Sequence, residues 1–343
     1  MKTVVYHGAQ EFSVEEVPVP QIGAGEMLVN VIGCGLCSTD VARAKYDRAK
    51  PGAVLGHEIS GEVEKVGSGV DKFQPGDKVG VFHHAPCGAC PYCLSDQEPL
   101  CEQYRKTNVD PGGFAQYIRV IPELVKKSVL HLPPGMSSEH GTLIEPTACC
   151  LRALNESRIT PGETLLILGD GPMGLISAQL ARRMGAYQIL VSGHHDYRLE
   201  KAESLGADHT LNSRKEDIQG AIRDLTAGLG ADLVLVAAAS TPAVKEATTL
   251  VRPGGRICVI GDFRDVPQPP LDLELRLVLQ HHVSILGSWG CSPKDYTASL
   301  KMLQAGAIDA DKTITHYFNL TDFHKALNTA ESKECLRVVL KPQ

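Results

Sequence analysis

The stretch TLLILGDGPMG, residues 164–174, decides the fold of this chain. An apolar run of strand length enters a glycine-rich turn, and a helical pattern follows over residues 173–184. A dinucleotide-binding unit requires a strand, a GxGxxG turn and a helix start in this order. The first glycine allows the tight turn, the second lets backbone approach a pyrophosphate, and the third lets helix and strand pack closely. The free N–H groups at the helix start then face the phosphates. The candidate cofactor-binding positions in this turn are Gly169, Gly171, Pro172, Met173 and Gly174.

The composition is that of an ordinary globular protein, with 43% hydrophobic and 22% charged residues. A length of 343 residues favours two domains. The formal net charge of −6 gives no electrostatic indication of binding to nucleic acid or to an anionic membrane. Neither a signal peptide nor an apolar run of transmembrane length is found. Eleven cysteines without a secretion signal indicate metal ligands and buried thiols, so we expect a cytoplasmic protein.

Two kinds of pattern divide the chain. Up to about residue 130, short β-patterns alternate with Gly/Pro turns and predict an irregular, mostly antiparallel barrel. Examples are Glu26–Ile32, Glu58–Val66, Asp77–Phe82, Phe114–Val120 and Val129–Leu132. From about residue 145, strands alternate with helices, which is typical of a doubly wound parallel sheet of six strands. These strands are Leu165–Leu168, Gln188–Ser192, His209–Leu211, Asp232–Val236, Arg256–Ile260 and Val283–Leu286.

The last segment contains a helix, Pro293–Gln304, and a strand, Leu336–Leu340, and is too short to fold alone. We expect it to return to the first domain. The predicted catalytic domain therefore comprises residues 1–148 and 291–343, and the predicted nucleotide-binding domain comprises residues 149–290.

Four cysteines follow one another closely in a single loop: Cys87, Cys90, Cys93 and Cys101. Four thiolates with this spacing can close a tetrahedron around Zn²⁺ and leave no open position, which makes a structural site. The alternatives are unrelated buried cysteines, or a zinc module for nucleic acid. The second alternative is disfavoured because residues 77–104 are not basic.

A second set of metal-binding side chains lies elsewhere. Cys37 stands in the segment GCGLCSTD, and Gly56-His57-Glu58 follows it. Thiolate, imidazole and carboxylate are ligands of a catalytic zinc that keeps one position for water or substrate. A further carboxylate, Glu145, lies where the two kinds of pattern meet. Taken singly, each of these residues could be a core histidine or a solvated acid, but together with the cysteine loop and the GxGxxG turn they favour an active site.

These motifs, in this order, resemble the zinc-dependent medium-chain dehydrogenase/reductase family over nearly the whole chain, and within it the sorbitol dehydrogenase-like branch. The resemblance implies a GroES-like catalytic domain and a Rossmann domain. It also implies two zinc ions per chain, an NAD(P) cofactor and a homodimer or homotetramer. Cys37, His57 and Glu58 would be ligands or near-ligands of the catalytic zinc. Glu145 would be the fourth ligand, bound directly or through water.

The resemblance also assigns residues around the zinc. Asp40 would accept a hydrogen bond from the far nitrogen of His57 and fix its tautomer. Thr39 would bind the substrate hydroxyl and start the exit of its proton. Ala42 stands where many relatives have a histidine that passes this proton to solvent. Ile260, at a predicted strand end, and Arg337 are assigned to the cofactor, although Arg337 could equally be a surface residue. His83 and His84 could extend a zinc site, but a structural role is the better interpretation.

The implied activity is that of a dehydrogenase acting on a secondary hydroxyl of a polyol, sugar alcohol or similar polar alcohol. One alternative is a dehydrogenase for an amino-alcohol such as threonine. Another is a zinc-free reductase relative or a non-catalytic nucleotide-binding protein. We expect Trp289 to line the substrate pocket, although a position in the hydrophobic core is equally compatible with the sequence.

The cofactor is predicted from the end of the second Rossmann strand. NAD-binding units carry a carboxylate there, about 20 residues past the glycines. Gly193 occupies this position, so that no carboxylate opposes a 2′-phosphate, and His194, His195 and Arg198 offer donors nearby. Asp196 is interpreted as a helix N-cap, with a displaced ribose ligand as the alternative. The sequence therefore favours NADP(H), or use of both cofactors, and NAD(H) bound through backbone contacts is the alternative.

Overall fold

The computed structural model describes residues 1–264 and 266–343, which form two compact units. The first unit consists of Met1–Ala148, Gly290–Gly306 and Ile314–Gln343. The second consists of Cys149–Trp289 and Ala307–Thr313. The change of unit after residue 148 coincides with the predicted domain boundary. Residues 307–313 belong to the second unit. The sequence had instead placed them in the first. In the described part of the chain, no helix is both long and apolar enough to cross a membrane.

The second unit is built on a six-stranded sheet in the order β10-β9-β8-β11-β12-β13. Every neighbouring pair in it is parallel, which confirms the predicted Rossmann-type sheet. Buried apolar runs such as Leu165–Leu168 form its central strands, because a parallel sheet is covered on both faces. The strands are β8 (Thr164–Leu168), β9 (Gln188–Gly193), β10 (His209–Asn212), β11 (Ala231–Val236), β12 (Val251–Val259) and β13 (Ser284–Gly287).

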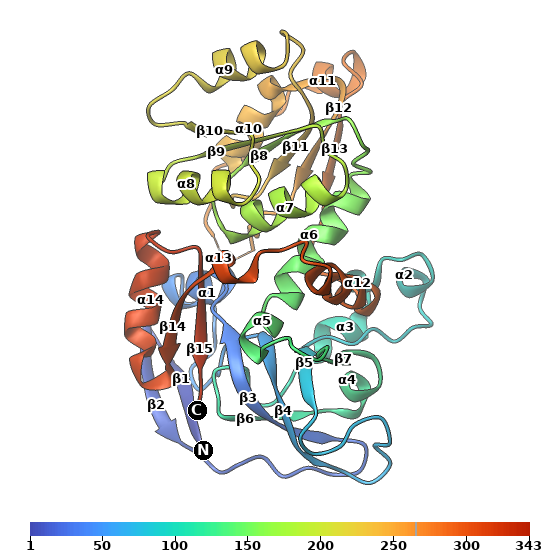
Figure 1. Ribbon diagram of the computed structural model, residues 1–343, viewed down its shortest axis with the longest axis vertical. Coiled ribbons are helices and arrows are strands. Elements are labelled where there is room, and N and C mark those ends of the chain that lie inside the picture. The colour runs from blue at the N-terminus through green and yellow to red at the C-terminus, as the bar shows by residue number, and fades with distance from the viewer. Residues whose placement is uncertain (265) are drawn as a thin grey trace. The chain divides into compact units, whose positions relative to one another are not determined.

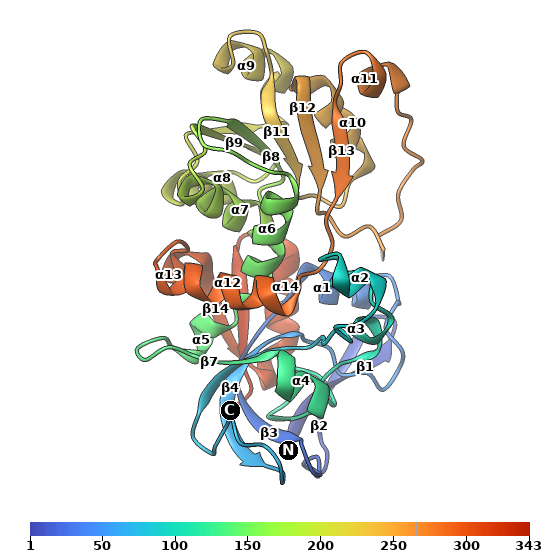
Figure 2. The same ribbon diagram turned by 90° about the vertical axis from the view of Figure 1, so that its right-hand side faces the viewer.

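Helices cover both faces of this sheet (Figure 2). They are α7 (Pro172–Arg183), α8 (Asp196–Ser204), α9 (Ile218–Leu225), α10 (Thr241–Leu250) and α11 (Leu275–Leu279), and α13 (Ala310–Thr313) belongs to the same unit. Each crossover connects one parallel strand to the next, so the glycine-rich turn between β8 and α7 lies at the carboxyl edge of the sheet.

That turn needs its glycines for steric reasons. Gly169 has φ +128°, a backbone conformation that side-chain-bearing residues rarely adopt. A Cβ at Gly174 would lie 2.2 Å from the carbonyl oxygen of Gly169, so helix and turn could not approach each other with any other residue there. Pro172 is the first residue of α7, where its missing N–H is not needed.

The first unit contains a seven-stranded sheet in the order β14-β15-β3-β4-β5-β7, with β6 paired to β3 (Figure 1). All its pairs are antiparallel except β14 with β15. The strands are β3 (Met27–Gly35), β4 (Glu58–Val66), β5 (Lys78–Phe82), β6 (Tyr117–Val120), β7 (Val129–His131), β14 (Ile314–Asn319) and β15 (Arg337–Lys341). A separate antiparallel hairpin is formed by β1 (Lys2–Gly8) and β2 (Glu11–Glu16). The C-terminal segment therefore joins the sheet of the first unit beside β3.

Short helices connect these strands: α1 (Ser38–Lys45), α2 (Pro91–Leu94), α3 (Glu102–Lys106), α4 (Pro122–Lys127), α5 (Ser138–Gly141), α12 (Pro293–Gln304), α14 (Phe323–Ser332) and the 3-10 turns η1 (Glu98–Leu100) and η2 (Leu320–Asp322). Helix α6 (Ile144–Glu156) contains the change from the first unit to the second. Helix α14 was not predicted, although Phe323, Ala326 and Leu327 bury one face of it at helical spacing.

Candidate metal and cofactor sites

The structure brings Cys37, His57 and Glu58 together: one ligand atom from each lies within 4.8 Å of the others. Cys37 is the residue that precedes α1, His57 precedes β4, and Glu58 is the first residue of β4. Strand β4 pairs with β3 so that Glu58 lies opposite Gly35, close to the end of β3 from which the chain leads to Cys37. Two neighbouring strands of one sheet thus place a sulfur, an imidazole and a carboxylate at a single point.

Asp40 positions His57 and the backbone next to Cys37 and His57. Its buried carboxylate accepts hydrogen bonds from the backbone N–H groups of Cys37 at 3.2 Å and Gly56 at 3.4 Å, and it lies 3.4 Å from Nδ1 of His57. Burial acts to raise the pKa of Asp40, but the neighbouring His57 outweighs it and lowers that pKa. The structure therefore provides the histidine partner that the resemblance implied, and Nε2 of His57 is left for a metal.

The ionisation of this group suits zinc. Burial would raise the pKa of Cys37, yet the charge and hydrogen bond of His57 lower it. Burial would lower the pKa of His57, yet Asp40 and Cys37 raise it well above its usual range. Both shifts favour the charged forms, thiolate at Cys37 and imidazolium at His57, and a metal cation that displaces the imidazole proton would take over the same charge. Thiolate, imidazole and carboxylate are a donor set that zinc accepts.

Glu58 has an unexpected partner in Arg337. The carboxylate and the guanidinium form an ion pair, and their side chains are only 1% and 2% exposed. A Cβ at Gly35 would overlap Oε2 of Glu58 and lie 3.1 Å from Nη2 of Arg337, so the glycine in β3 makes room for the pair. Arg337 is therefore not a surface residue. Its assignment to the cofactor stays a prediction, while the structure gives it a partner in the predicted zinc-ligand group.

Glu145 lies outside this group of three in the described structure. It stands in the first turn of α6, and its carboxylate is within 4.8 Å of the sulfur of Cys291. A direct bond from Glu145 to a metal held by Cys37 would require a shift of the side chain, so the water-mediated form of the prediction fits this placement better. Thr39 is half-buried in the first turn of α1, two residues after Cys37.

The four cysteines of the loop also converge. The sulfurs of Cys87, Cys90, Cys93 and Cys101 lie within 4.8 Å of one another. Backbone N–H groups point at these sulfurs at 3.3–3.4 Å, donated by Cys87, Gly88, Ala89 and Cys90. The N–H groups of Ala89 and Cys90 lower the pKa of Cys87 to about 6. These donors favour thiolate at Cys87, whereas burial raises the pKa of Cys93 to about 12. The convergence of the four sulfurs fits a closed four-cysteine zinc site.

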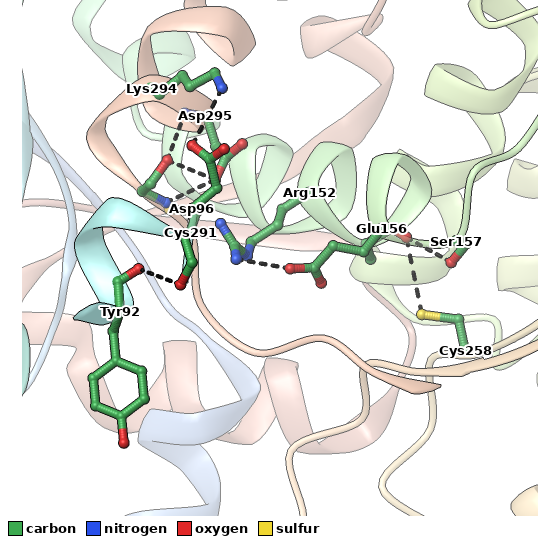
Figure 3. Close-up of polar contacts among 12 residues, drawn as sticks. Tyr92, Asp96, Arg152, Glu156, Ser157, Cys258, Cys291, Lys294 and Asp295 are labelled. Carbon is green, nitrogen blue, oxygen red and sulfur yellow. Dashed lines mark hydrogen bonds and ion pairs between the residues drawn. The ribbon is translucent and has the colours of Figure 1, made fainter. Parts of the chain in front are cut away.

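Several contacts attach this loop to the rest of the first unit, and the ammonium of Lys127 donates to the carbonyl oxygens of Pro86 and Cys87 at 2.7 and 2.8 Å. The hydroxyl of Tyr104 donates to the carbonyl oxygen of Cys291 at 2.9 Å. The exposed side chains of Lys294, from α12, and Asp96 form an ion pair at 3.5 Å (Figure 3). An exposed pair of this kind contributes little.

His83 and His84 support the surroundings of both groups. Nδ1 of His84 lies 3.0 Å from the carbonyl oxygen of Thr107, and its ring lies against Tyr104. The ring centroid of His83 is 5.1 Å from that of His57. Burial lowers the pKa of His83 well below its usual range, so it is a neutral neighbour of His57. These contacts agree with the structural role expected for the pair.

The glycine-rich turn of the second unit leaves free space beside Gly171, where a phosphate would bind. A Cβ at Gly171 would meet only Nη1 of Arg198, at 4.0 Å, whereas one at Gly174 would clash with backbone. Gly171 is also the residue that precedes α7, whose first N–H groups lack helical partners. The turn thus leaves room for a pyrophosphate at a helix N-terminus.

Comparison with known proteins identifies the family. Residues 23–133 match the model of the alcohol dehydrogenase GroES-like domain, and residues 172–305 match that of the zinc-binding dehydrogenases. The sorbitol dehydrogenase of Halalkalibacterium halodurans is 32% identical, over 100% of this chain and 99% of that protein. The chain belongs to the zinc-dependent medium-chain dehydrogenase/reductase family. The L-threonine 3-dehydrogenase of Pyrococcus abyssi is 33% identical over 93% of this chain and 90% of that protein.

Solved structures agree with this assignment. A zinc-binding dehydrogenase of Sinorhizobium meliloti 1021, bound to NADP, has a TM-score of 0.90 and 29% identity, with 99% of both chains covered. A short chain alcohol dehydrogenase of Escherichia coli CFT073, complexed with NADH, has a TM-score of 0.88 and 26% identity, again with 99% of both covered. The present chain is therefore an oxidoreductase with a GroES-like and a Rossmann-type domain, in the sorbitol dehydrogenase-like branch of the family.

The end of β9 in this dehydrogenase differs from the sequence-based expectation. The absence of a side chain at Gly193 was expected to leave room for a 2′-phosphate. A Cβ at Gly193 would instead lie 2.4 Å from Oδ2 of Asp170, so a carboxylate from the glycine-rich turn fills this space. Asp170 was not predicted as a cofactor residue, because an acid was expected only at the strand end, although Asp170 stands inside the GxGxxG turn itself.

The other predicted cofactor residues of the dehydrogenase lie around this point. Nδ1 of His194 is 2.7 Å from the hydroxyl of Ser213. Arg198 is buried in α8, with Nη1 3.9 Å from Asp170. The N-cap of α8 is His195 and not Asp196, so the predicted cap is wrong. Asp196 is the first helical residue, and its carboxylate accepts from Asn212 and Lys215 at 2.7 Å.

Two predicted residues lie farther along the second unit. Ile260 directly follows β12, and its N–H donates to the carbonyl oxygen of Val236 at 3.0 Å, so it lies at the same carboxyl edge of the sheet as the glycine turn. Trp289 is half-buried, with the guanidinium of Arg264 4.7 Å from its ring centroid. It is not a plain core tryptophan.

Proposed function

We propose that this dehydrogenase transfers a hydride between a secondary hydroxyl carbon of a polyol or sugar alcohol and a nicotinamide cofactor. The observation that carries the proposal is the group of Cys37, His57 and Glu58, held by Asp40, in a chain of the zinc-dependent family. A zinc ion bound there would acidify a substrate hydroxyl or polarise a carbonyl, and NAD(P) would exchange the hydride.

The residues of the chain have separate tasks in this proposal. Cys37 and His57 would bind the catalytic metal as thiolate and neutral imidazole, with Glu58 as a third ligand or near-ligand. Asp40 holds His57 in position and accepts from its Nδ1–H. Thr39, on the first turn of α1, would accept the proton that leaves the substrate hydroxyl and pass it on. Glu145 would take part through a water molecule. Cys87, Cys90, Cys93 and Cys101 would hold a second, structural zinc.

A polar substrate is supported by the ligand set and by the low aromatic content of 5%, which makes a wide apolar pocket a poor fit. The similarity to a sorbitol dehydrogenase points the same way. The similarity to an L-threonine 3-dehydrogenase makes an amino-alcohol the second candidate. A non-catalytic nucleotide-binding role has less support, because such a role does not require the metal-binding group of Cys37, His57 and Glu58.

For the cofactor we propose NADP(H), or use of both NADP(H) and NAD(H). His194, His195 and Arg198 supply donors near the end of β9, and Gly193 itself carries no acid. The carboxylate of Asp170 opposes this preference, and the balance between these groups would leave NAD(H) usable. Similar proteins have been solved with each cofactor.

An oligomer is also part of the proposal. In the described sheet, β13 is an end strand that pairs with β12 alone. Beside it, Leu275 and Leu279 of α11 are 75% and 77% exposed, and Ile285 is partly exposed. An edge strand flanked by exposed apolar side chains suits association with a second copy. The cytoplasmic location stays a prediction from the cysteine usage.

The test is a panel of polyols, sugar alcohols, L-threonine, simple alkanols and benzyl alcohol, assayed with NAD and with NADP. Hydrogen bonds to several hydroxyls should give discrimination of roughly 10⁴-fold against analogues that lack them. We expect the highest kcat/KM with a polyol or sugar alcohol. L-Threonine as the best substrate would select the second candidate. Faster oxidation of benzyl alcohol or alkanols than of every polyol would contradict the proposal.

A further inference from the structure

A carboxylate of the glycine-rich turn occupies the position at which dinucleotide-binding units place an acid for the adenosine ribose. A Cβ on Gly193, the last residue of β9, would lie 2.4 Å from Oδ2 of Asp170 and 2.5 Å from its Cβ. The side chain of Asp170 therefore fills the volume that the side chain of residue 193 would take. Residue 193 follows the last GxGxxG glycine by the spacing at which the ribose-binding acid is expected.

The surroundings of Asp170 hold its carboxylate firmly. Its side chain is 8% exposed. Oδ2 accepts the backbone N–H groups of His194 at 2.7 Å and His195 at 2.9 Å, and Nδ1 of His195 lies 2.9 Å from the same oxygen. Nη1 of Arg198 is 3.9 Å from Oδ1. Both backbone donors bind Oδ2, so Oδ1 keeps an acceptor position for a ribose hydroxyl.

We propose that Asp170 is a specificity-determining residue for the adenosine ribose of the cofactor. The proposal rests on the nicotinamide-dependent function proposed above. Asp170 replaces the missing acid of residue 193: it accepts a hydrogen bond from a ribose hydroxyl and repels a phosphate on the 2′-oxygen. His194 and Arg198 attract that phosphate. The preference between NADP(H) and NAD(H) therefore reflects a balance between the attraction by His194 and Arg198 and the repulsion by the Asp170 carboxylate.

A purely structural role predicts a different result. In that case Asp170 only anchors the backbone of His194 and His195, and its charge has no influence on the ligand. Asp170→Asn separates the two roles, because an amide oxygen can still accept from both N–H groups while the charge is lost. The imidazole of His195 can accept from the amide in its other tautomer. The loop is then retained and only the electrostatic effect on the 2′-phosphate disappears.

The experiment is calorimetric titration of the full chain with ADP-ribose and with 2′-phospho-ADP-ribose, which requires no turnover. We expect Asp170→Asn to raise the affinity for the 2′-phosphorylated ligand relative to ADP-ribose by about tenfold, the effect of a like charge removed from within a few ångströms. The matched control is Glu200→Gln. Glu200 is an exposed carboxylate of α8, and its variant should change the ratio by less than about threefold.

A second pair of variants covers the case in which Asp170→Asn does not fold. Asp170→Gly should shift the ratio toward the 2′-phosphorylated ligand. The double variant Asp170→Gly/Gly193→Asp moves the acid back to the strand end and should restore the wild-type ratio. An unchanged ratio in Asp170→Asn and Asp170→Gly, with both ligands still bound, would overturn the proposal and leave Asp170 as a loop anchor. Failure of both ligands to bind the wild type would instead overturn the proposed dinucleotide-dependent function.

Discussion

The buried pair of Arg337 and Glu58 allows a stability prediction that can be worked from the structure. Replacing Arg337 by Met removes the cation from a site where its side chain is 2% exposed and leaves the Glu58 carboxylate at 1% exposure. An uncompensated buried charge of this kind costs about 3–5 kcal/mol of unfolding free energy. Each kcal/mol lowers Tm by about 2–4 °C in a domain of this size, so we expect a decrease of roughly 6–20 °C.

The assay is differential scanning calorimetry of the metal-free full chain, for Arg337→Met and for a matched control, because a zinc ion bound near Glu58 would itself compensate the stranded carboxylate. Lys341→Met removes a cation from the same strand, but Lys341 is 43% exposed and its pair with Glu139 should contribute less than about 1 kcal/mol. Adding Glu58→Gln to Arg337→Met should recover part of the loss, because the stranded charge is then gone. Equal effects of Arg337→Met and Lys341→Met, or strictly additive effects at Arg337 and Glu58, would refute the reasoning.

Three further predictions concern the two sites. Gly171→Ala should leave Tm nearly unchanged but weaken ADP-ribose binding more than about tenfold. Gly174→Ala should lower Tm, because of these two variants only the Cβ of Gly174→Ala would meet backbone. Equal Tm losses in the two variants would contradict this. Asp40→Asn should weaken zinc binding at the catalytic site about 10–100-fold in a chelator titration, and an unchanged affinity would remove Asp40 from the site. Zinc affinity there should rise with pH, by up to about tenfold per unit for each proton displaced, because Asp40 and Cys37, against the effect of burial, raise the pKa of His57 and the metal must displace its proton. A flat profile between pH 6 and 8 would contradict this assignment.

Features that depend on local sequence could be predicted well. The β8 strand and the glycine-rich turn follow from an unbroken apolar run and the spacing of three glycines. The cysteine loop was predicted from the spacing of its four thiols, which lie within fifteen residues of one another. Strand β4 and helix α12 begin and end where the sequence analysis placed them.

Features that depend on the direction of a side chain or on the pairing of distant strands could not be predicted from the sequence. Arg337 meets Glu58 because β15 and β4 both lie beside β3, and no local pattern specifies that arrangement. Asp170 turns toward the end of β9, and only the missing Cβ of Gly193 permits this. The sequence alone could not tell that the acid absent from one segment is supplied by another.

The proposed ligand assignment places Cys37 in a catalytic zinc site and Cys93 in a structural one. Its most direct test is the zinc content per chain, measured by mass spectrometry of the metal, together with polyol turnover and Tm in the wild type, Cys37→Ala and Cys93→Ala. We predict two zinc ions in the wild type. Cys37→Ala should lose turnover with little change in Tm, and Cys93→Ala should lose zinc and stability, because a closed site contributes more to folding than an open one. Near-normal turnover of Cys37→Ala with two zinc ions still bound would contradict the claim.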